Sequence, residues 1–177
     1  MAKVAFVLAD DFEDSEFKKP YDCVREAGHK ATVVGTETGK EVKGKKGKEK
    51  FTIESTPDHV SADQFDALII PGGYSPDKLR MNEEARRFVR EMERAKKPFA
   101  VICHAPWLLI SAGLAKSRRM TSYYTIQDDL RNAGADWVDE EVVRDQNWVT
   151  SRQPDDIPAF NRAMAELLSG VRARQAA

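Results

Sequence analysis

Short apolar runs alternate with amphipathic stretches over most of the chain. Compact apolar runs bounded by turn residues predict core strands at 3–8, 30–35, 67–70 and 99–102. Apolar positions at helical spacing predict helices at 14–27, 82–95, 106–112, 126–133 and 155–168. The strand–helix–strand order over residues 3–35 is a βαβ unit, so its two strands are expected to be parallel.

Two further segments predict β-hairpins. Glycines separate short polar pieces in residues 38–54, where Phe51 and Ile53 alternate with polar residues, and we expect an exposed hairpin there. A second hairpin is expected where Asp145-Gln146-Asn147 joins two short strands. The whole pattern predicts an α/β fold with a doubly wound sheet, in one domain over residues 1–170 with a frayed tail at 171–177. Ligands are expected beyond the carboxyl ends of the strands.

Charge and hydropathy argue against two classes of partner. The 177 residues include 28 Lys plus Arg and 29 Asp plus Glu, a formal net charge of −1, so no global field attracts nucleic acid or an anionic membrane. No apolar run approaches the roughly 20 residues of a membrane helix. The apolar start of the chain is interrupted at Asp10 and Asp11 without a signal-peptide pattern, and we expect a cytoplasmic protein.

The hairpin at 38–54 is rich in lysine, at positions 40, 43, 45, 46, 48 and 50. A solvated edge that resists aggregation explains these lysines most simply. Nucleic-acid contact is the weaker interpretation, because no aromatic residues interleave with the lysines to stack bases, and a place at a subunit interface stays open. The histidines His29, His59 and His104 do not cluster, so we expect no metal site.

The segment Phe99–Pro106 carries the strongest chemical signal. An apolar strand delivers Cys103 to its carboxyl end and a helix follows at once, which is the layout of a nucleophile elbow. The free N–H groups and the dipole of that helix favour a thiolate, and the N–H of His104 is placed to act as an oxyanion donor. The competing interpretation is an inert core cysteine, since unpaired cysteines are often buried.

Other groups at the same edge of the sheet could assist the thiol. Gly73 ends the neighbouring strand, and its N–H could complete an oxyanion hole. His104 is the candidate base, although adjacent side chains often point apart. A carboxyl group pressed against the sulfur would have a raised pKa and could donate a hydrogen bond to it. The residues alone do not choose that acid among Asp10, Asp11, Glu13, Asp14 and Glu16.

Five segments in this order resemble the ThiJ/PfpI superfamily, and most closely its PfpI branch of intracellular proteases and general stress proteins. The segments are Ala9–Asp14, Asp66–Gly73, Ala100–Pro106, Thr121–Tyr123 and Asn132–Ala135. The similarity runs from about residue 3 to residue 168, nearly the whole chain. No single segment is decisive, but the ordered set is specific.

This resemblance implies a flavodoxin-like three-layer sandwich with a mostly parallel central sheet, and a homodimer or larger assembly. It implies Cys103 as the reactive cysteine, Glu13 as the buried acid that hydrogen-bonds it, and the backbone N–H groups of Gly73 and His104 as the oxyanion hole. In the proteases of this branch, an acid from a neighbouring subunit orients the histidine. Asp77 stands at that position and is one methylene shorter than the glutamate of the proteases.

We therefore expect a stress-response, cysteine-dependent hydrolase that needs no cofactor. Its substrates would be glyoxal or methylglyoxal adducts of proteins or nucleotides, or else peptides. The adducts are favoured because the shorter Asp77 weakens the protease arrangement. The alternative is a non-enzymatic oxidative-stress sensor or redox-regulated chaperone that uses the same Cys103. Glutamine amidotransferase chemistry needs a later histidine, and none follows His104.

Overall fold

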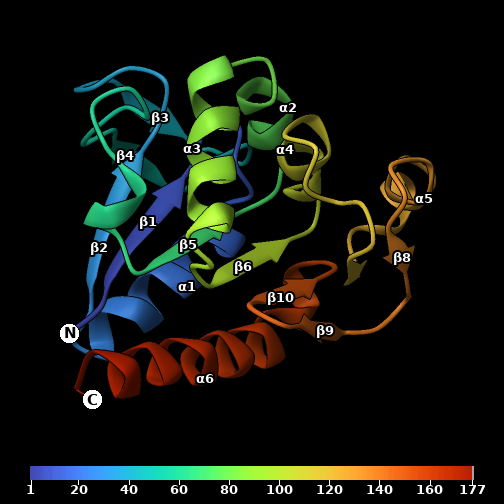
Figure 1. Cartoon of the computed structure of the whole chain (residues 1–177). Helices are drawn as coiled ribbons and strands as arrows, with labels where there is room; N and C mark the ends of the chain where they lie inside the picture. The colour runs from blue at the N-terminus through green and yellow to red at the C-terminus, as the bar shows by residue number, and fades with distance from the viewer. Residues whose placement is uncertain (177) are drawn as a thin grey trace.

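The central feature of the fold is a six-stranded sheet with strand order β2-β1-β5-β6-β10-β9 (Figure 1). The computed structural model describes residues 1–176. All neighbouring strands are parallel except β9 and β10, which form the predicted antiparallel hairpin. The first five strands follow the flavodoxin-like order, so the predicted α/β fold is confirmed. The strands are β1 (Lys3–Val7), β2 (Lys30–Val34), β5 (Ala67–Ile70), β6 (Phe99–Ile102), β9 (Val142–Asp145) and β10 (Trp148–Ser151).

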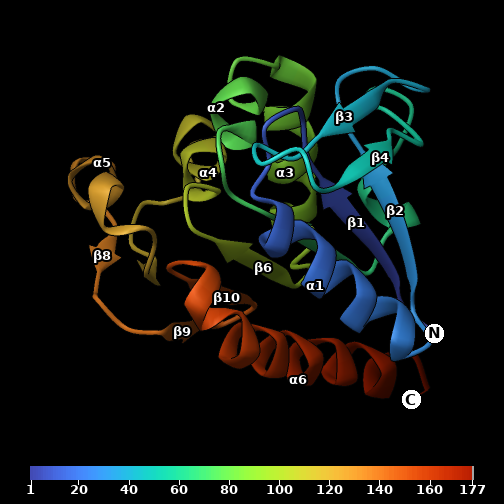
Figure 2. The same cartoon turned by 180° about the vertical axis from the view of Figure 1, so that it is seen from behind.

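Helices cover both faces of the sheet and complete the three layers. One face carries α1 (Asp14–Glu26) and α6 (Ile157–Ala176), and the other carries α3 (Glu83–Arg94) and α4 (Pro106–Ser111), as Figures 1 and 2 show from opposite sides. The shorter helical elements are η1 (Ala62–Gln64), α2 (Ser75–Leu79), η2 (Tyr124–Ile126), α5 (Gln127–Asn132) and η3 (Pro154–Asp156). The helix predicted at 126–133 corresponds to α5, and the 3₁₀ turn η2 directly precedes it.

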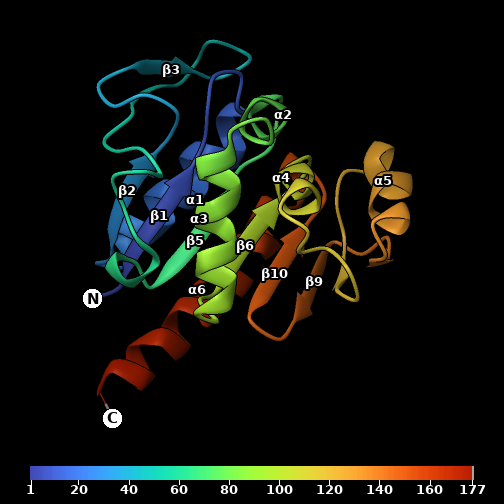
Figure 3. The same ribbon diagram turned by 45° about the horizontal axis from the view of Figure 1, so that its top comes forward.

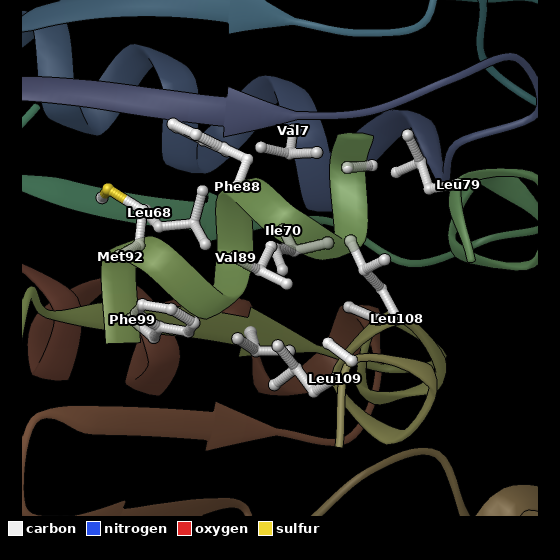
Figure 4. Close-up of a cluster of buried hydrophobic side chains, with 14 of the residues drawn as sticks. Val7, Leu68, Ile70, Leu79, Phe88, Val89, Met92, Phe99, Leu108 and Leu109 are labelled. Carbon is white, nitrogen blue, oxygen red and sulfur yellow. The ribbon is translucent and has the colours of Figure 1, made fainter. Parts of the chain in front are cut away.

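Alternate side chains of the parallel strands build two separate cores. Ala5 and Val7 of β1 face α3, whereas Val4 and Phe6 face α1 and α6, because successive strand side chains point to opposite faces. Figure 4 shows the first core, with Leu68 and Ile70 of the sheet packed beneath α3. Both faces of these strands are buried, which explains their continuous apolar sequence.

The predicted lysine-rich hairpin forms from β3 (Glu41–Lys43) and β4 (Lys50–Thr52), which pair antiparallel. It is not a free edge, because Val42 and Ile53 are fully packed into the core. Phe12 bridges to Gly44 of the hairpin and to Gly73 at the end of β5. The hairpin therefore lies beyond the carboxyl end of β1, where ligands are expected (Figure 3).

Two parts of the structure differ in extent from the sequence pattern. The strands β7 (Arg119–Met120) and β8 (Asp136–Trp137) form a small parallel pair that the sequence does not predict. The sequence predicts a frayed tail from residue 171, but helix α6 continues through Ala176 and its Val171 is buried. Residue 177 lies outside the described residues. Among the described residues, no helix is both long and apolar enough to span a membrane.

Candidate active site

Cys103 occupies a strained turn between β6 and α4. Its φ is +64°, in the left-handed region, which costs an ordinary residue roughly 1–2 kcal/mol. Two backbone hydrogen bonds hold it there: the Cys103 N–H donates to the Ser151 carbonyl at 3.0 Å, and the Tyr123 N–H donates to the Cys103 carbonyl at 3.0 Å. Because the surroundings enforce this conformation, the sulfur is directed at the carboxyl edge of the sheet, as in a nucleophile elbow.

The predicted thiol, histidine and oxyanion donors come together at this turn. The Cys103 Sγ lies 3.1 Å from His104 Nδ1, so these neighbouring side chains converge instead of pointing apart. The backbone N–H groups of Gly73 and His104 both donate toward Sγ. Gly73 has a φ of +77°, and a Cβ there would lie 2.4 Å from the Asp11 carbonyl oxygen, so only glycine fits.

The acid beside the sulfur is Glu16, which corrects the role expected for Glu13. Glu16 is 0% exposed, its Oε2 accepts the Gly72 N–H at 2.9 Å, and its carboxyl is in hydrogen-bonding range of the Cys103 thiol. Glu13 is the N-cap residue of α1 with extended backbone. Its carboxylate pairs with Lys45 at 2.8 Å and Lys46 at 2.9 Å, at the mouth of the site. Glu16, inside the first turn of α1, reaches the cysteine, whereas the carboxylate of Glu13 is engaged by the hairpin lysines.

The two glutamates have opposite electrostatic environments. Burial raises the pKa of Glu16 to about 8, with a further contribution from the negative charge of Glu13. Burial also acts to raise the pKa of Glu13, but hydrogen bonds and charges from Lys45 and Lys46 outweigh it, and the pKa is lowered. At neutral pH Glu16 is therefore mostly protonated and can donate a hydrogen bond, whereas Glu13 is an anion.

The surroundings of the Cys103 sulfur both oppose and favour its ionisation. Burial raises the pKa of Cys103, the charge of Glu16 adds to the rise, and the N–H groups of Gly73 and His104 oppose it. Cys103 is only 6% exposed, and α4 has just six residues and starts at Pro106. The thiolate expected from the sequence stays a prediction. Burial and the Lys45 charge lower the pKa of His104. His104 is thus a neutral base within reach of the thiol proton.

The rest of the His104 ring contacts residues of α4 and of the segment that follows it. Nε2 lies 3.4 Å from the Thr125 hydroxyl oxygen, and the ring packs on Tyr123 and Trp107 at centroid distances of 5.0 and 4.9 Å. Sequence reasoning did not single out Thr125, which lies in a short 3₁₀ turn without periodicity. Asp77 does not line this site within the protomer: its side chain is 62% exposed and lies 3.9 Å from Arg80. Its role across a subunit interface stays a prediction.

These groups line one pocket of about 440 Å³. Cys103 and Glu16 belong to its wall, and the pocket is within the size range of small-ligand sites. The pocket is also lined by Lys45, Lys46, Tyr74, Tyr123, Thr125 and Pro154. The lysine-rich hairpin therefore contributes to the site.

Comparison with known sequences gives matches over nearly the whole chain. Residues 2–167 match the DJ-1/PfpI family. General stress protein 18 of Bacillus subtilis is 50% identical over 167 residues, which cover 94% of this chain and 97% of that protein. Protein/nucleic acid deglycase 2 of Escherichia coli is 47% identical over the same shares of the two chains.

The fold also matches solved structures. A two-domain protein of Anabaena variabilis, with a DJ-1/ThiJ/PfpI-like and a ferritin-like domain, superposes with a TM-score of 0.94 at 37% identity. The match covers 96% of this chain and 48% of that chain, so this chain spans about half the length of the two-domain protein.

Proposed function

Because the chain belongs to the DJ-1/PfpI family, we propose that it is a cysteine-dependent hydrolase that removes methylglyoxal or glyoxal adducts from amines or thiols. The observation that supports this most is the convergence of the Cys103 thiol, the His104 base at 3.1 Å and two backbone N–H donors in one small pocket. Relatives named as a general stress protein and as a protein/nucleic acid deglycase agree with a stress-response role and with this substrate class.

The first step is nucleophilic attack by Cys103. His104 Nδ1 takes the thiol proton, and the sulfur forms a bond to the aldehyde-derived carbon of the adduct. The bond from that carbon to the amine or thiol breaks, and the leaving group takes the proton from His104. The product of this step is a hemithioacetal on Cys103 and the repaired parent group.

The second step uses no external oxidant. For methylglyoxal, a proton moves from the sulfur-bearing carbon through an enediol to the neighbouring carbon, which converts the hemithioacetal into a lactoyl thioester. Water then hydrolyses the thioester and releases lactate. The N–H groups of Gly73 and His104 stabilise the oxyanions of these steps, and the protonated Glu16 donates toward the sulfur.

The environment of Cys103 favours this enzyme over the sensor alternative. Selective oxidation requires thiolate character and exposure, whereas Cys103 is 6% exposed and its pKa is raised by burial. In the proposed enzyme, the thiol proton passes to His104 during the attack, so no standing thiolate is required. Mild peroxide treatment followed by peptide mapping tests the alternative: selective oxidation at Cys103 without any adduct turnover would favour a sensor.

The test is turnover of defined methylglyoxal adducts, with the spontaneously released aldehyde removed by a scavenger. We expect the wild type and Cys23→Ser to release the parent amine or thiol together with lactate, and Cys103→Ser to stay at the uncatalysed rate. A fluorogenic peptide in parallel tests the protease activity. Release by Cys103→Ser at the wild-type rate, or no release by the wild type, would overturn the proposal.

A further inference from the structure

We propose that Lys45 and Lys46 form an anion subsite at the mouth of the Cys103 pocket. This subsite would select adducts that carry a carboxylate or a phosphate close to the reacting carbon. The substrate class rests on the proposed function, but the charge selectivity of the pocket can be measured without it. The lysines therefore have a role beyond that of a solvated edge.

The backbone that carries the two lysines is firmly anchored. The buried Asp14 carboxylate accepts the N–H groups of Lys46, Lys48 and Glu49, each at 2.9 Å. A Cβ on Gly44 would lie 2.3 Å from the Asp14 carboxyl carbon, so the loop packs tightly against this anchor. A flexible charged loop would have no such anchor, and the two ammonium groups are thus held over one place.

The same loop is joined to the oxyanion donors. Phe12 forms β-bridges both to Gly44 of the hairpin and to Gly73, whose N–H is one of the oxyanion donors, so backbone pairing through Phe12 connects these two segments. Lys45 also interacts electrostatically with Cys103, and its charge reaches His104. The cationic groups are therefore close to the reacting atoms and not merely on the same face of the molecule.

The local charge at the pocket mouth is positive, although the whole chain has a net charge of −1. Among the acids that line the pocket, Glu13 opposes Lys45 and Lys46, whereas Glu16 is mostly protonated at neutral pH. The nearby Asp14 carboxylate is not part of the lining and accepts three backbone N–H groups of the loop. The lysine side chains are 36% and 53% exposed. Each ammonium group has three N–H donors, so both keep donors free to meet an incoming anion.

Alkylation of Cys103 by two matched reagents measures this charge effect directly. Iodoacetate is an anion and iodoacetamide is neutral, and in both the Cys103 sulfur bonds to the methylene carbon and releases iodide. In a Cys23→Ser background only Cys103 reacts, and the ratio of the two rates removes any change in the nucleophilicity of the thiol. For Lys45→Gln/Lys46→Gln we expect the iodoacetate-to-iodoacetamide ratio to fall by about threefold to tenfold at low salt.

Two further variants make the test decisive. Glu13→Gln removes the opposing charge and should raise the ratio by about twofold to fivefold. Lys50→Gln is the control, because it removes one positive charge from the same hairpin. Lys50 pairs with Glu41 and does not line the pocket, so the ratio should stay unchanged. Two results would overturn the subsite. One is an unchanged rate ratio in Lys45→Gln/Lys46→Gln. The other is a fall of the ratio in Lys50→Gln as large as the fall per lysine in the double variant.

Substrate pairs then identify the source of the anion. The carboxylate arm compares methylglyoxal adducts of N-acetylcysteine and N-acetylcysteamine, and the phosphate arm compares adducts of guanosine monophosphate and guanosine. The double lysine variant should lose kcat/KM for the charged member of at least one pair, mainly through KM, and keep it for the neutral members. Turnover of all four without any such loss would contradict the subsite alone, whereas no turnover of any adduct would contradict the proposed function.

Discussion

The protonation of Glu16 makes a quantitative prediction about stability. The pKa of this buried carboxyl is about 8, against 4.5 for an ordinary glutamate. An acid with a raised pKa in the folded state favours unfolding as the pH rises, because the unfolded chain ionises first. Its full effect is present below the ordinary pKa of 4.5 and is lost progressively up to about 8. At about 1.4 kcal/mol per pH unit, roughly 2 to 3 kcal/mol is lost between about pH 5.5 and 7.5.

Glu16→Gln removes this titration while it preserves much of the local geometry. The amide oxygen can accept the Gly72 N–H as Oε2 does, and the amide group is neutral like the protonated acid. We therefore expect the variant to gain stability relative to the wild type as the pH rises. The free-energy difference between them should grow by roughly 2 to 3 kcal/mol over the same interval. Denaturant unfolding of both proteins at three pH values measures it.

Glu13→Gln is the matched control. The pKa of Glu13 is lowered, so its contribution to stability is complete above the ordinary pKa of 4.5 and is lost only below it. Glu13→Gln should therefore diverge from the wild type far less than Glu16→Gln does over this interval, and only because the charge of Glu13 contributes to the raised pKa of Glu16. If Glu16→Gln runs parallel to the wild type, or Glu13→Gln diverges as much as Glu16→Gln, the assignment of the buried acid is refuted.

Three other changes test the geometry of the site. Gly72→Ala should cost about 1–3 kcal/mol in denaturant unfolding, because its Cβ would lie 2.6 Å from the Cys103 Cβ; an unchanged midpoint would contradict this packing. Asp14→Ala should speed amide hydrogen exchange in the loop at 46–49 by about tenfold or more, since it removes charge-assisted hydrogen bonds, and equal exchange would show that the anchor is dispensable. Thr125→Val should lower kcat by about twofold to fivefold, because His104 Nε2 loses its 3.4 Å contact; an unchanged kcat would exclude a positioning role for this hydroxyl.

The sequence pattern predicts the main sheet well because its strands are buried on both faces. Continuous apolar runs such as Ala67–Ile70 and Phe99–Ile102 have few alternatives to a core strand. The pair of β7 and β8 escapes prediction because each strand has only two residues, too few to show a period. The long elements therefore suffice to predict the fold, whereas the pair of β7 and β8 depends on tertiary contacts.

The site was predicted only as far as local sequence determines it. Cys103 and Gly73 follow directly from strand ends, so their convergence could be expected. The choice between Glu13 and Glu16 depends on where α1 begins and which way its first turn faces, which five nearby acids do not reveal. The placement of Lys45 depends on the docking of the hairpin onto Asp14, a contact between distant segments.

The central claim is that the Cys103 sulfur carries the reacting carbon unit during turnover. The direct measurement is rapid acid quenching of the protein during a single turnover of a methylglyoxal adduct, followed by peptide mapping with mass spectrometry. We expect one three-carbon unit on the Cys103 peptide of the wild type, none on the Cys23 peptide, and neither the unit nor lactate with Cys103→Ser. Lactate formation at the wild-type rate by Cys103→Ser would show that another group carries the carbon unit.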